Sequence, residues 1–171
     1  MTFKNKVAIV TGGGRDIGRA VSLQLAAEGA KVCINFANDE ASAQETLRLI
    51  QEAGGEAVLH RADVTAAAAV GGLGAAAQAA FGRKIDVLVN TAGGMVARKP
   101  LAEIDEGFFH TVMDLNLKSV FLTTKAVVPH MEAGGAIVNF ASLAGRDGGG
   151  PGAAIYATAK AAVMTFTRAM A

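Results

Sequence analysis

The chain has 171 residues, of which 51% are hydrophobic and 18% charged, and sixteen basic residues nearly balance fifteen acidic ones. This composition excludes a disordered chain. The formal charge of +1 gives no electrostatic reason to expect nucleic acid or an acidic membrane surface as a partner. The length suits a single domain, residues 1–171, with a sizeable core.

Cysteine and histidine usage narrows the class further. Cys33 is the only cysteine, which rules out an internal disulfide and suits a reducing compartment. His60, His110 and His130 are too widely spaced to predict a metal site. The sequence starts without a signal-peptide pattern and has no apolar segment long enough to span a bilayer. We therefore expect a soluble, cytoplasmic protein.

Apolar, strand-like runs alternate with segments of helical period along the whole chain. Strands are expected at Lys6–Val10, Lys31–Phe36, Glu56–His60, Ile85–Val89 and Ala136–Ala141. Helices are expected at Ile17–Glu28, Glu40–Ala53, Ala66–Phe81, Leu101–Met113 and Leu117–Met131. The alternation predicts an α/β fold with a doubly wound parallel sheet, and we expect the Rossmann-like strand order 3-2-1-4-5.

Polar and glycine-rich segments follow the strands where such a sheet binds its ligands, beyond the carboxyl ends of the strands. These segments are Thr11–Gly18, Asp63, Asn90–Gly93 and Ser142. In the first of them a strand, a glycine turn and a helix follow one another, which is the context that a dinucleotide-binding turn requires. Glycines let the backbone approach a pyrophosphate, and the helix N-terminus offers it free N–H groups.

Tyr156 and Lys160 are four residues apart in an alanine-rich run, so on a helix their side chains share one face. A fixed ammonium one turn away stabilises a phenolate, which brings a phenol towards the range useful for general acid/base catalysis. Ser142 could be brought back by a glycine-rich loop to face the tyrosine. Alternatively, Tyr156 and Lys160 are an ordinary amphipathic pair on a solvated face.

Taken together, the motifs resemble those of the short-chain dehydrogenase/reductase family of the classical type, over nearly the full chain. Thr11–Gly18 resembles the family's TGxxxGxG turn, and Ala62-Asp63-Val64 resembles the segment whose aspartate holds the adenine ring. Asn90-Thr91-Ala92-Gly93 resembles the NNAG motif, which supports the sheet and lines the cofactor.

The same resemblance assigns the catalytic residues. Asn116 falls where the family has a helix-kinking asparagine that organises a proton-relay water, and Ser142, Tyr156 and Lys160 match the catalytic serine and YxxxK. The cofactor contacts that it implies are Thr11, Gly12, Gly14, Arg15, Asp16, Ile17, Gly18, Asn35, Asp63, Val64, Asn90, Ala92, Gly93, Tyr156 and Lys160. It implies an oxidoreductase that transfers hydride between nicotinamide and a ketone or secondary alcohol.

The choice of cofactor has a physical basis. An acidic residue at the end of the second strand would accept from the adenosine ribose and repel a 2′-phosphate. That place is Asn35-Phe36-Ala37, with no carboxylate until Asp39, while Arg15 could pair with a 2′-phosphate. We predict NADP(H) in preference to NAD(H); the alternative is that Arg15 points to solvent.

The chain departs from the family pattern at two positions and at its end. Asp16 stands where the turn usually has its second glycine, and Thr91 replaces the second asparagine of NNAG. Relatives continue through at least two more strands, a lid over the substrate and a loop that touches the nicotinamide, so we expect either a further segment after Ala171 or a fragment. A non-catalytic nucleotide-binding fragment or scaffold is therefore the alternative function.

Partners are expected from the family as well. A 3-oxoacyl thioester bound to a carrier protein is a familiar substrate among the relatives. Relatives usually pair through helices corresponding to Leu101–Met131 and Ala154–Ala169, so we expect a homo-oligomer, a dimer or tetramer. Arg98-Lys99 is interpreted as a solvated loop.

Overall fold

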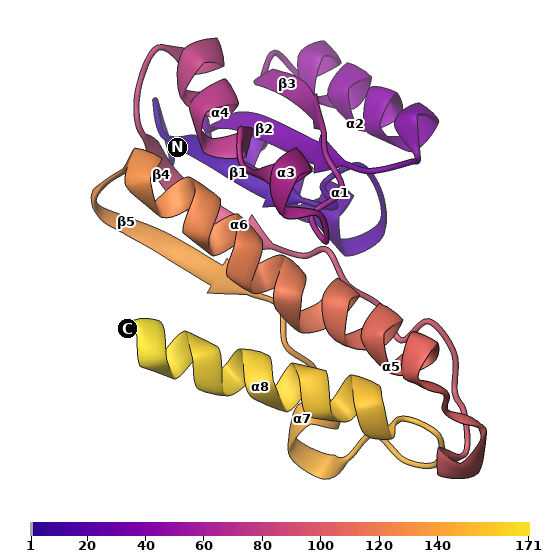
Figure 1. Ribbon diagram of the computed structural model, residues 1–171. Coiled ribbons are helices and arrows are strands. Elements are labelled where there is room, and N and C mark those ends of the chain that lie inside the picture. Colours follow the sequence, from indigo (N-terminus) through magenta and orange to yellow (C-terminus); the bar gives the residue numbers. More distant parts are fainter. Residues whose placement is uncertain (1) are drawn as a thin grey trace.

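The computed structural model describes residues 2–171 (Figure 1). Five strands form one parallel sheet in the order β3-β2-β1-β4-β5, which confirms the predicted order. The strands are β1 (Val7–Thr11), β2 (Lys31–Phe36), β3 (Glu56–Arg61), β4 (Ile85–Asn90) and β5 (Met131–Asn139). All their carboxyl ends therefore meet at one edge of the sheet.

Helices connect the strands and cover both faces of the sheet, as the near-continuous apolar runs of the central strands require. The α-helices are α1 (Asp16–Ala27), α2 (Glu40–Glu52), α3 (Ala67–Val70), α4 (Leu73–Phe81), α5 (Glu106–Met113), α6 (Ser119–Val127), α7 (Ala144–Asp147) and α8 (Ala154–Met170). Shorter helical segments are the 3₁₀ turns η1 (Leu101–Glu103) and η3 (Val128–His130) and the π-helical turn η2 (Asp114–Lys118).

The core is divided into two layers by the alternation of side chains along the strands. On β1, Val7 and Ile9 face a cluster that includes Leu73 of α4. Ala8 of the same strand faces the opposite cluster, with Ile50 of α2. Since successive side chains of a strand point to opposite faces, one buried strand serves both layers.

Two predicted helices are wrong in their extent. The predicted helix Ala66–Phe81 is broken into α3 and α4 at Gly71 and Gly72, where glycine makes helix propagation costly. The predicted helix Leu101–Met113 is a 3₁₀ turn followed by α5, because Ile104 is extended and Asp105 then caps α5, accepting from the Phe108 N–H at 2.6 Å.

The start predicted for the following helix is also wrong. The chain does not begin a new helix at Leu117 but continues from α5 through the π turn η2 into α6.

The fifth strand is predicted at Ala136–Ala141 and instead covers Met131–Asn139, with an irregular register against Ile85 and Val87. This strand lies at the sheet edge and is exposed over much of its length.

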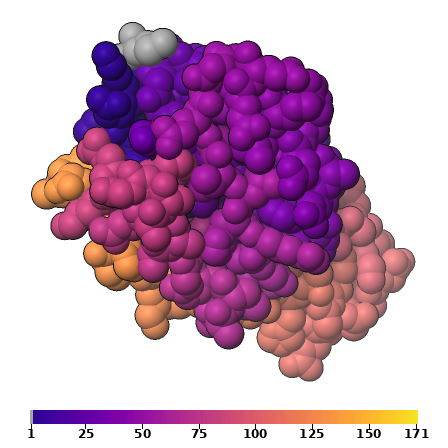
Figure 2. Space-filling view, turned by 90° about the horizontal axis from the view of Figure 1, so that it is seen from above, coloured from indigo at the N-terminus to yellow at the C-terminus, as the bar shows by residue number. Residues whose placement is uncertain are grey.

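The space-filling view shows how these elements build the outer surface. In Figure 2 the purple to magenta surface of α2, β3 and the following segment is continuous, and the salmon surface around α5 projects at one side. Among residues 2–171, no helix is long and apolar enough to cross a membrane.

Candidate active site

A cavity of about 480 Å³ opens at the carboxyl ends of the first four strands. Most of the predicted cofactor contacts line it: Gly12, Gly14, Arg15, Asp16, Ile17, Gly18, Asn35, Asp63, Val64, Ala92 and Gly93. The lining also includes residues of the predicted cofactor motifs that were not named as contacts, namely Phe36, Ala37, Asp39, Ala62 and Thr91, together with Asn38 and Leu115. The position of the cavity is the one that the sheet topology predicts for a ligand.

The turn between β1 and α1 forms one wall of the cavity. Gly12 has a φ of +61°, and a Cβ added to Gly18 would overlap the Gly12 carbonyl oxygen, so both positions require glycine. Arg15 is the N-cap residue of α1 and its side chain caps no N–H group. The first N–H groups of α1 are thus left for an anion.

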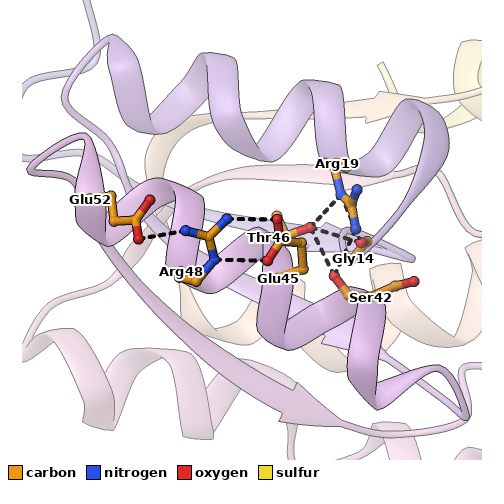
Figure 3. Close-up of polar contacts among 7 residues, drawn as sticks. All are labelled: Gly14, Arg19, Ser42, Glu45, Thr46, Arg48 and Glu52. Carbon is orange, nitrogen blue, oxygen red and sulfur yellow. Dashed lines mark hydrogen bonds and ion pairs between the residues drawn. The ribbon is translucent and has the colours of Figure 1, made fainter.

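A buried threonine of α2 holds this turn from behind (Figure 3). Thr46 is fully buried, and its hydroxyl donates to the Gly14 carbonyl oxygen at 2.7 Å while accepting from Arg19 Nε at 2.8 Å. Arg19 Nη2 donates in addition to the Ser42 carbonyl oxygen at 3.0 Å. Space is tight as well, since a Cβ on Gly14 would lie 2.9 Å from Ala43 Cα. The turn is therefore fixed by packing and by hydrogen bonds from α2.

Asn35 has a positioning role as well as lining the cavity. Its side chain is buried, with Oδ1 accepting from the Gly12 N–H at 3.4 Å and Nδ2 donating to the Ala62 carbonyl oxygen at 2.9 Å. It thus joins the glycine turn to the segment that follows β3. That segment contains Asp63, whose Oδ1 accepts from both the N–H and the hydroxyl of Thr65 at 2.8 Å.

Thr11 and Asn90 lie behind the cavity and are absent from its lining. The Thr11 hydroxyl accepts from the Ala92 N–H at 3.2 Å. Asn90 is buried, accepting from the Thr123 hydroxyl at 2.6 Å and donating to Asn139 Oδ1 at 2.8 Å. These two side chains join β1, β4, β5 and α6 at the edge of the sheet that holds the cavity.

Gly93 is the point where the cavity meets two of the predicted catalytic residues. A Cβ added to Gly93 would lie 3.0 Å from Asn116 Oδ1 and 3.1 Å from Lys160 Nζ. Asn116 is fully buried in the π turn and binds the backbone of Gly94 on both sides, accepting from its N–H at 3.0 Å and donating to its carbonyl oxygen at 2.8 Å. Asn116 also donates to the Val112 carbonyl oxygen at 2.9 Å.

Lys160 is an unusually buried lysine, only 4% exposed. Its ammonium donates to the Phe140 carbonyl oxygen at 2.7 Å and lies 5.9 Å from the centre of the Tyr156 ring. Burial lowers the pKa of the Lys160 ammonium below its ordinary value. Tyr156 and Lys160 therefore share one face of α8, on which Lys160 is buried and Tyr156 is half-buried.

Ser142 follows β5 in a loop that leads into α7. Its hydroxyl accepts from the Ala144 N–H at 3.2 Å. The short helix α7 packs closely on α8, because a Cβ on Gly145 would lie 2.8 Å from the Ala161 nitrogen. Within residues 2–171 no hydrogen bond joins Ser142 to Tyr156; the two are related through the packing of α7 on α8.

Arg98 lies in an exposed loop, as predicted, but its side chain also makes specific contacts. Its guanidinium donates to the carbonyl oxygens of Gly149 at 3.0 Å and Pro151 at 2.7 Å, and the Lys99 N–H donates to Gly152. The segment after β4 is thereby tied to the glycine loop that leads into α8. Among residues 2–171, no group of three or more His, Cys, Asp or Glu side chains is placed to hold a metal ion.

Comparisons with known proteins agree with this geometry. The family model for short chain dehydrogenases matches residues 6–171. The chain is 38% identical over 171 residues to hydroxynaphthalene reductase arp2 of Aspergillus fumigatus, and it spans 62% of the length of that relative. The chain therefore belongs to the short-chain dehydrogenase/reductase family, and the class of protein predicted from the sequence is confirmed.

Two solved structures carry cofactors of different kinds. A short chain dehydrogenase from Burkholderia cenocepacia J2315 in complex with NADP has a TM-score of 0.94 and 30% identity, with 99% of this chain and 69% of that chain covered. The NADH-dependent reductase A1-R' complexed with NAD has a TM-score of 0.91 and 38% identity, with 98% and 72% covered. The neighbours thus support a site for a nicotinamide dinucleotide and leave the choice between the two cofactors open.

Proposed function

We propose that the protein is an NADP(H)-dependent oxidoreductase that interconverts a ketone and a secondary alcohol, with Tyr156 as the general acid/base. One observation carries this proposal. The buried Lys160 and Asn116 converge on Gly93, and Gly93 lines the cavity, so the lysine of the YxxxK pair adjoins the cavity and the centre of the Tyr156 ring lies 5.9 Å from its ammonium. A solvated Tyr–Lys pair would have no such connection.

The residues present fit a dinucleotide. Glycine at positions 12 and 18 allows the tight turn that lines the cavity, and the uncapped N-terminus of α1 faces the same cavity. When bound, the nicotinamide supplies hydride chemistry. The protein supplies binding, alignment and proton transfer.

Each catalytic residue has a separate task in this proposal. Tyr156 donates a proton to the carbonyl oxygen in reduction, or removes one from the alcohol in oxidation. Ser142 donates a hydrogen bond to the same oxygen. Lys160 stabilises the phenolate through its charge, and its lowered pKa eases passage of a proton onwards. Asn116 fixes the backbone beside Lys160.

The preference for NADP(H) is the finer part of the proposal. No carboxylate stands at Asn35, Phe36 or Ala37, which line the cavity at the end of β2, and Arg15 lines the same cavity. Asp39, the first acidic residue, uses its carboxylate to cap α2, accepting from the Ser42 N–H at 3.0 Å. A 2′-phosphate would meet the guanidinium rather than a free carboxylate.

Substrate, assembly and location complete the proposal. The name of the fungal relative points to a hydroxynaphthalene, which supports a cyclic or aromatic ketone beside the carrier-linked 3-oxoacyl thioester. Exposed apolar side chains of α6 and α8, including Phe121 and Met170, line a groove of about 210 Å³ that would pair with a second copy in a dimer or tetramer. We expect the protein in the cytoplasm. Sedimentation velocity tests the assembly into a dimer or tetramer.

The function is tested by ketone-dependent oxidation of NADPH. Tyr156→Phe should lower kcat by about a hundredfold or more, as expected for loss of a general acid, while NADPH binding is retained. Thr158→Val is the matched control, since Thr158 lies on the same helix with an exposed hydroxyl bonded to the Ala154 carbonyl oxygen. Equal, measurable rates for Tyr156→Phe and Thr158→Val would refute the role of Tyr156 as general acid/base. No ketone-dependent oxidation above background in the unaltered protein would favour the alternative of a non-catalytic nucleotide-binding scaffold.

A further inference from the structure

Asp16 holds a left-handed backbone conformation within the glycine turn. Its φ is +49°, and Asn5 and Val96 are the other non-glycine positions among residues 2–171 with positive φ. Glycine adopts this conformation without a steric penalty, whereas an aspartate adopts it at some cost. The turn thus keeps its shape with a carboxylate where the family has glycine.

The Asp16 carboxylate is paired with the neighbouring guanidinium. Asp16 Oδ2 lies 3.1 Å from Arg15 Nη1, and the two side chains are 75% and 67% exposed. Both line the cavity, at the N-terminus of α1. Because exposed ion pairs contribute little stability, Arg15 can exchange this partner for another anion at small cost.

The charges around the cavity are unfavourable for a polyanion. Arg15 is the one basic residue of the lining within residues 2–171, against three acidic residues, Asp16, Asp39 and Asp63. Asp39 is engaged as the cap of α2 and Asp63 accepts from Thr65. Of these three carboxylates, Asp16 is therefore the one that forms an ion pair with the Arg15 guanidinium.

The second guanidinium beside the turn cannot take the place of Arg15. Arg19 is bound to Thr46, to the Ser42 carbonyl oxygen and, at 3.3 Å, to the Gly14 carbonyl oxygen. These contacts keep it behind the turn, as Figure 3 shows. A phosphate that enters the cavity competes with Asp16 for Arg15.

We propose that Asp16 is a specificity-determining residue, whose carboxylate competes with the 2′-phosphate of NADP(H) for Arg15 and so lowers the preference for NADP(H) over NAD(H). This inference rests on the proposed dinucleotide site. The carboxylate has two separable effects. It repels the diphosphate that both cofactors share, and it retains Arg15 against the 2′-phosphate that NADP(H) alone carries.

The test is a double-mutant cycle on binding. NADPH and NADH are titrated by fluorescence, at one low salt concentration, against the unaltered protein, Asp16→Asn, Arg15→Gln and the double variant. Asparagine also tolerates the left-handed conformation, so the turn is kept. Asp16→Asn should tighten NADPH binding about tenfold, because it frees Arg15 for the 2′-phosphate and removes one negative charge near the diphosphate. It should tighten NADH binding about twofold, because only the effect on the shared diphosphate applies there.

The double variant isolates the competition for the guanidinium. With Arg15→Gln in place, Asp16→Asn should tighten both cofactors by the same factor, because the selective effect needs Arg15. Asp16→Gly should give the same ratio of NADPH to NADH affinity as Asp16→Asn, since relief of backbone strain acts on both cofactors equally.

Three results overturn the inference. They are an unchanged ratio of affinities in Asp16→Asn, a selective effect that survives Arg15→Gln, and a ratio in Asp16→Gly that differs from Asp16→Asn. Failure of the proposed dinucleotide site has a different signature: neither cofactor binds the unaltered protein or any variant. Binding of both cofactors with an unchanged ratio defeats only the role of Asp16.

Discussion

Thr46→Val removes one hydroxyl and leaves the shape of the side chain almost unchanged. In the variant the Gly14 carbonyl oxygen keeps only the 3.3 Å hydrogen bond from Arg19, and Arg19 Nε loses its 2.8 Å acceptor. A neutral hydrogen bond contributes about 1 kcal/mol and one to a charged group about 2 kcal/mol. Water at the half-buried Arg19 replaces part of the lost hydrogen bonding, so we expect the free energy of unfolding to fall by about 2 kcal/mol.

This loss is large enough to measure by thermal unfolding. For a chain of this length 1 kcal/mol corresponds to roughly 2–4 °C, so Tm should fall by about 4–8 °C. Because the lost bonds hold the turn that lines the cavity, the Kd for NADPH should rise by about threefold to tenfold. This rise corresponds to a loss of about 1 kcal/mol of binding free energy, the cost of holding the turn in its bound conformation.

Two controls identify the hydroxyl as the cause. Thr46→Ser keeps the hydroxyl and loses only a methyl group, so both Tm and Kd should stay close to those of the unaltered protein. Thr158→Val makes the same chemical change on an exposed helix face. If Thr46→Val were as stable and bound NADPH as well as Thr158→Val, the assignment of Thr46 as the support of the turn would be refuted.

Three further predictions concern other parts of the fold. Gly18→Ala places a Cβ into the carbonyl oxygen of the turn, so urea denaturation should show a loss of about 3 kcal/mol or more, and a loss under 1 kcal/mol would contradict the tight turn. At Asp86, burial raises the pKa of the carboxyl, but hydrogen bonds from Lys6 and the Val7 N–H outweigh it and lower that pKa overall. A lowered folded pKa contributes stability above the unfolded pKa and loses it as pH falls through the folded value, so Asp86→Asn should cost about 1 kcal/mol at neutral pH and progressively less below about pH 4; a cost independent of pH would contradict this. Arg98→Ala removes two hydrogen bonds to the glycine loop, so limited proteolysis should cut that loop faster than in the unaltered protein, and equal cleavage rates would show that Arg98 does not restrain it.

The sheet order and the location of the cavity could be predicted because they follow from pattern. Buried parallel strands read as uninterrupted apolar runs, and their carboxyl ends must meet at one edge. The glycine turn was recognisable for a similar reason, since the close approach of Gly18 to Gly12 leaves no other residue possible. These features follow from local sequence patterns together with the topology that doubly wound sheets adopt.

Other features depend on contacts between distant segments and leave no pattern in the sequence. The hydroxyl of Thr46 reaches a turn 32 residues away, and Arg98 reaches carbonyl oxygens more than 50 residues away. Nothing in the sequence pattern of α2 distinguishes Thr46 from the other polar residues of the helix. Asn90 and Thr11 were expected as cofactor contacts, yet their side chains are occupied by neighbouring strands and by α6.

The predicted helix boundaries are wrong where backbone preference and packing oppose the periodicity of apolar residues. The apolar pattern of residues 66–81 runs through Gly71 and Gly72, but two adjacent glycines end α3 there. Asn116 was expected to kink a helix, and the π turn at Asp114–Lys118 is the form that the irregularity takes. Its side chain then accepts and donates at Gly94, which periodicity could not indicate.

Transfer of deuterium from the cofactor is the most direct test of hydride transfer assisted by Tyr156. NADPH carrying deuterium at both C4 positions of the nicotinamide is incubated with an aromatic ketone and the protein, and the alcohol product is analysed by mass spectrometry. We predict that one deuterium appears on the carbinol carbon with the unaltered protein and that the product is lost with Tyr156→Phe. An alcohol without deuterium, or labelled alcohol formed equally by Tyr156→Phe, would contradict the account.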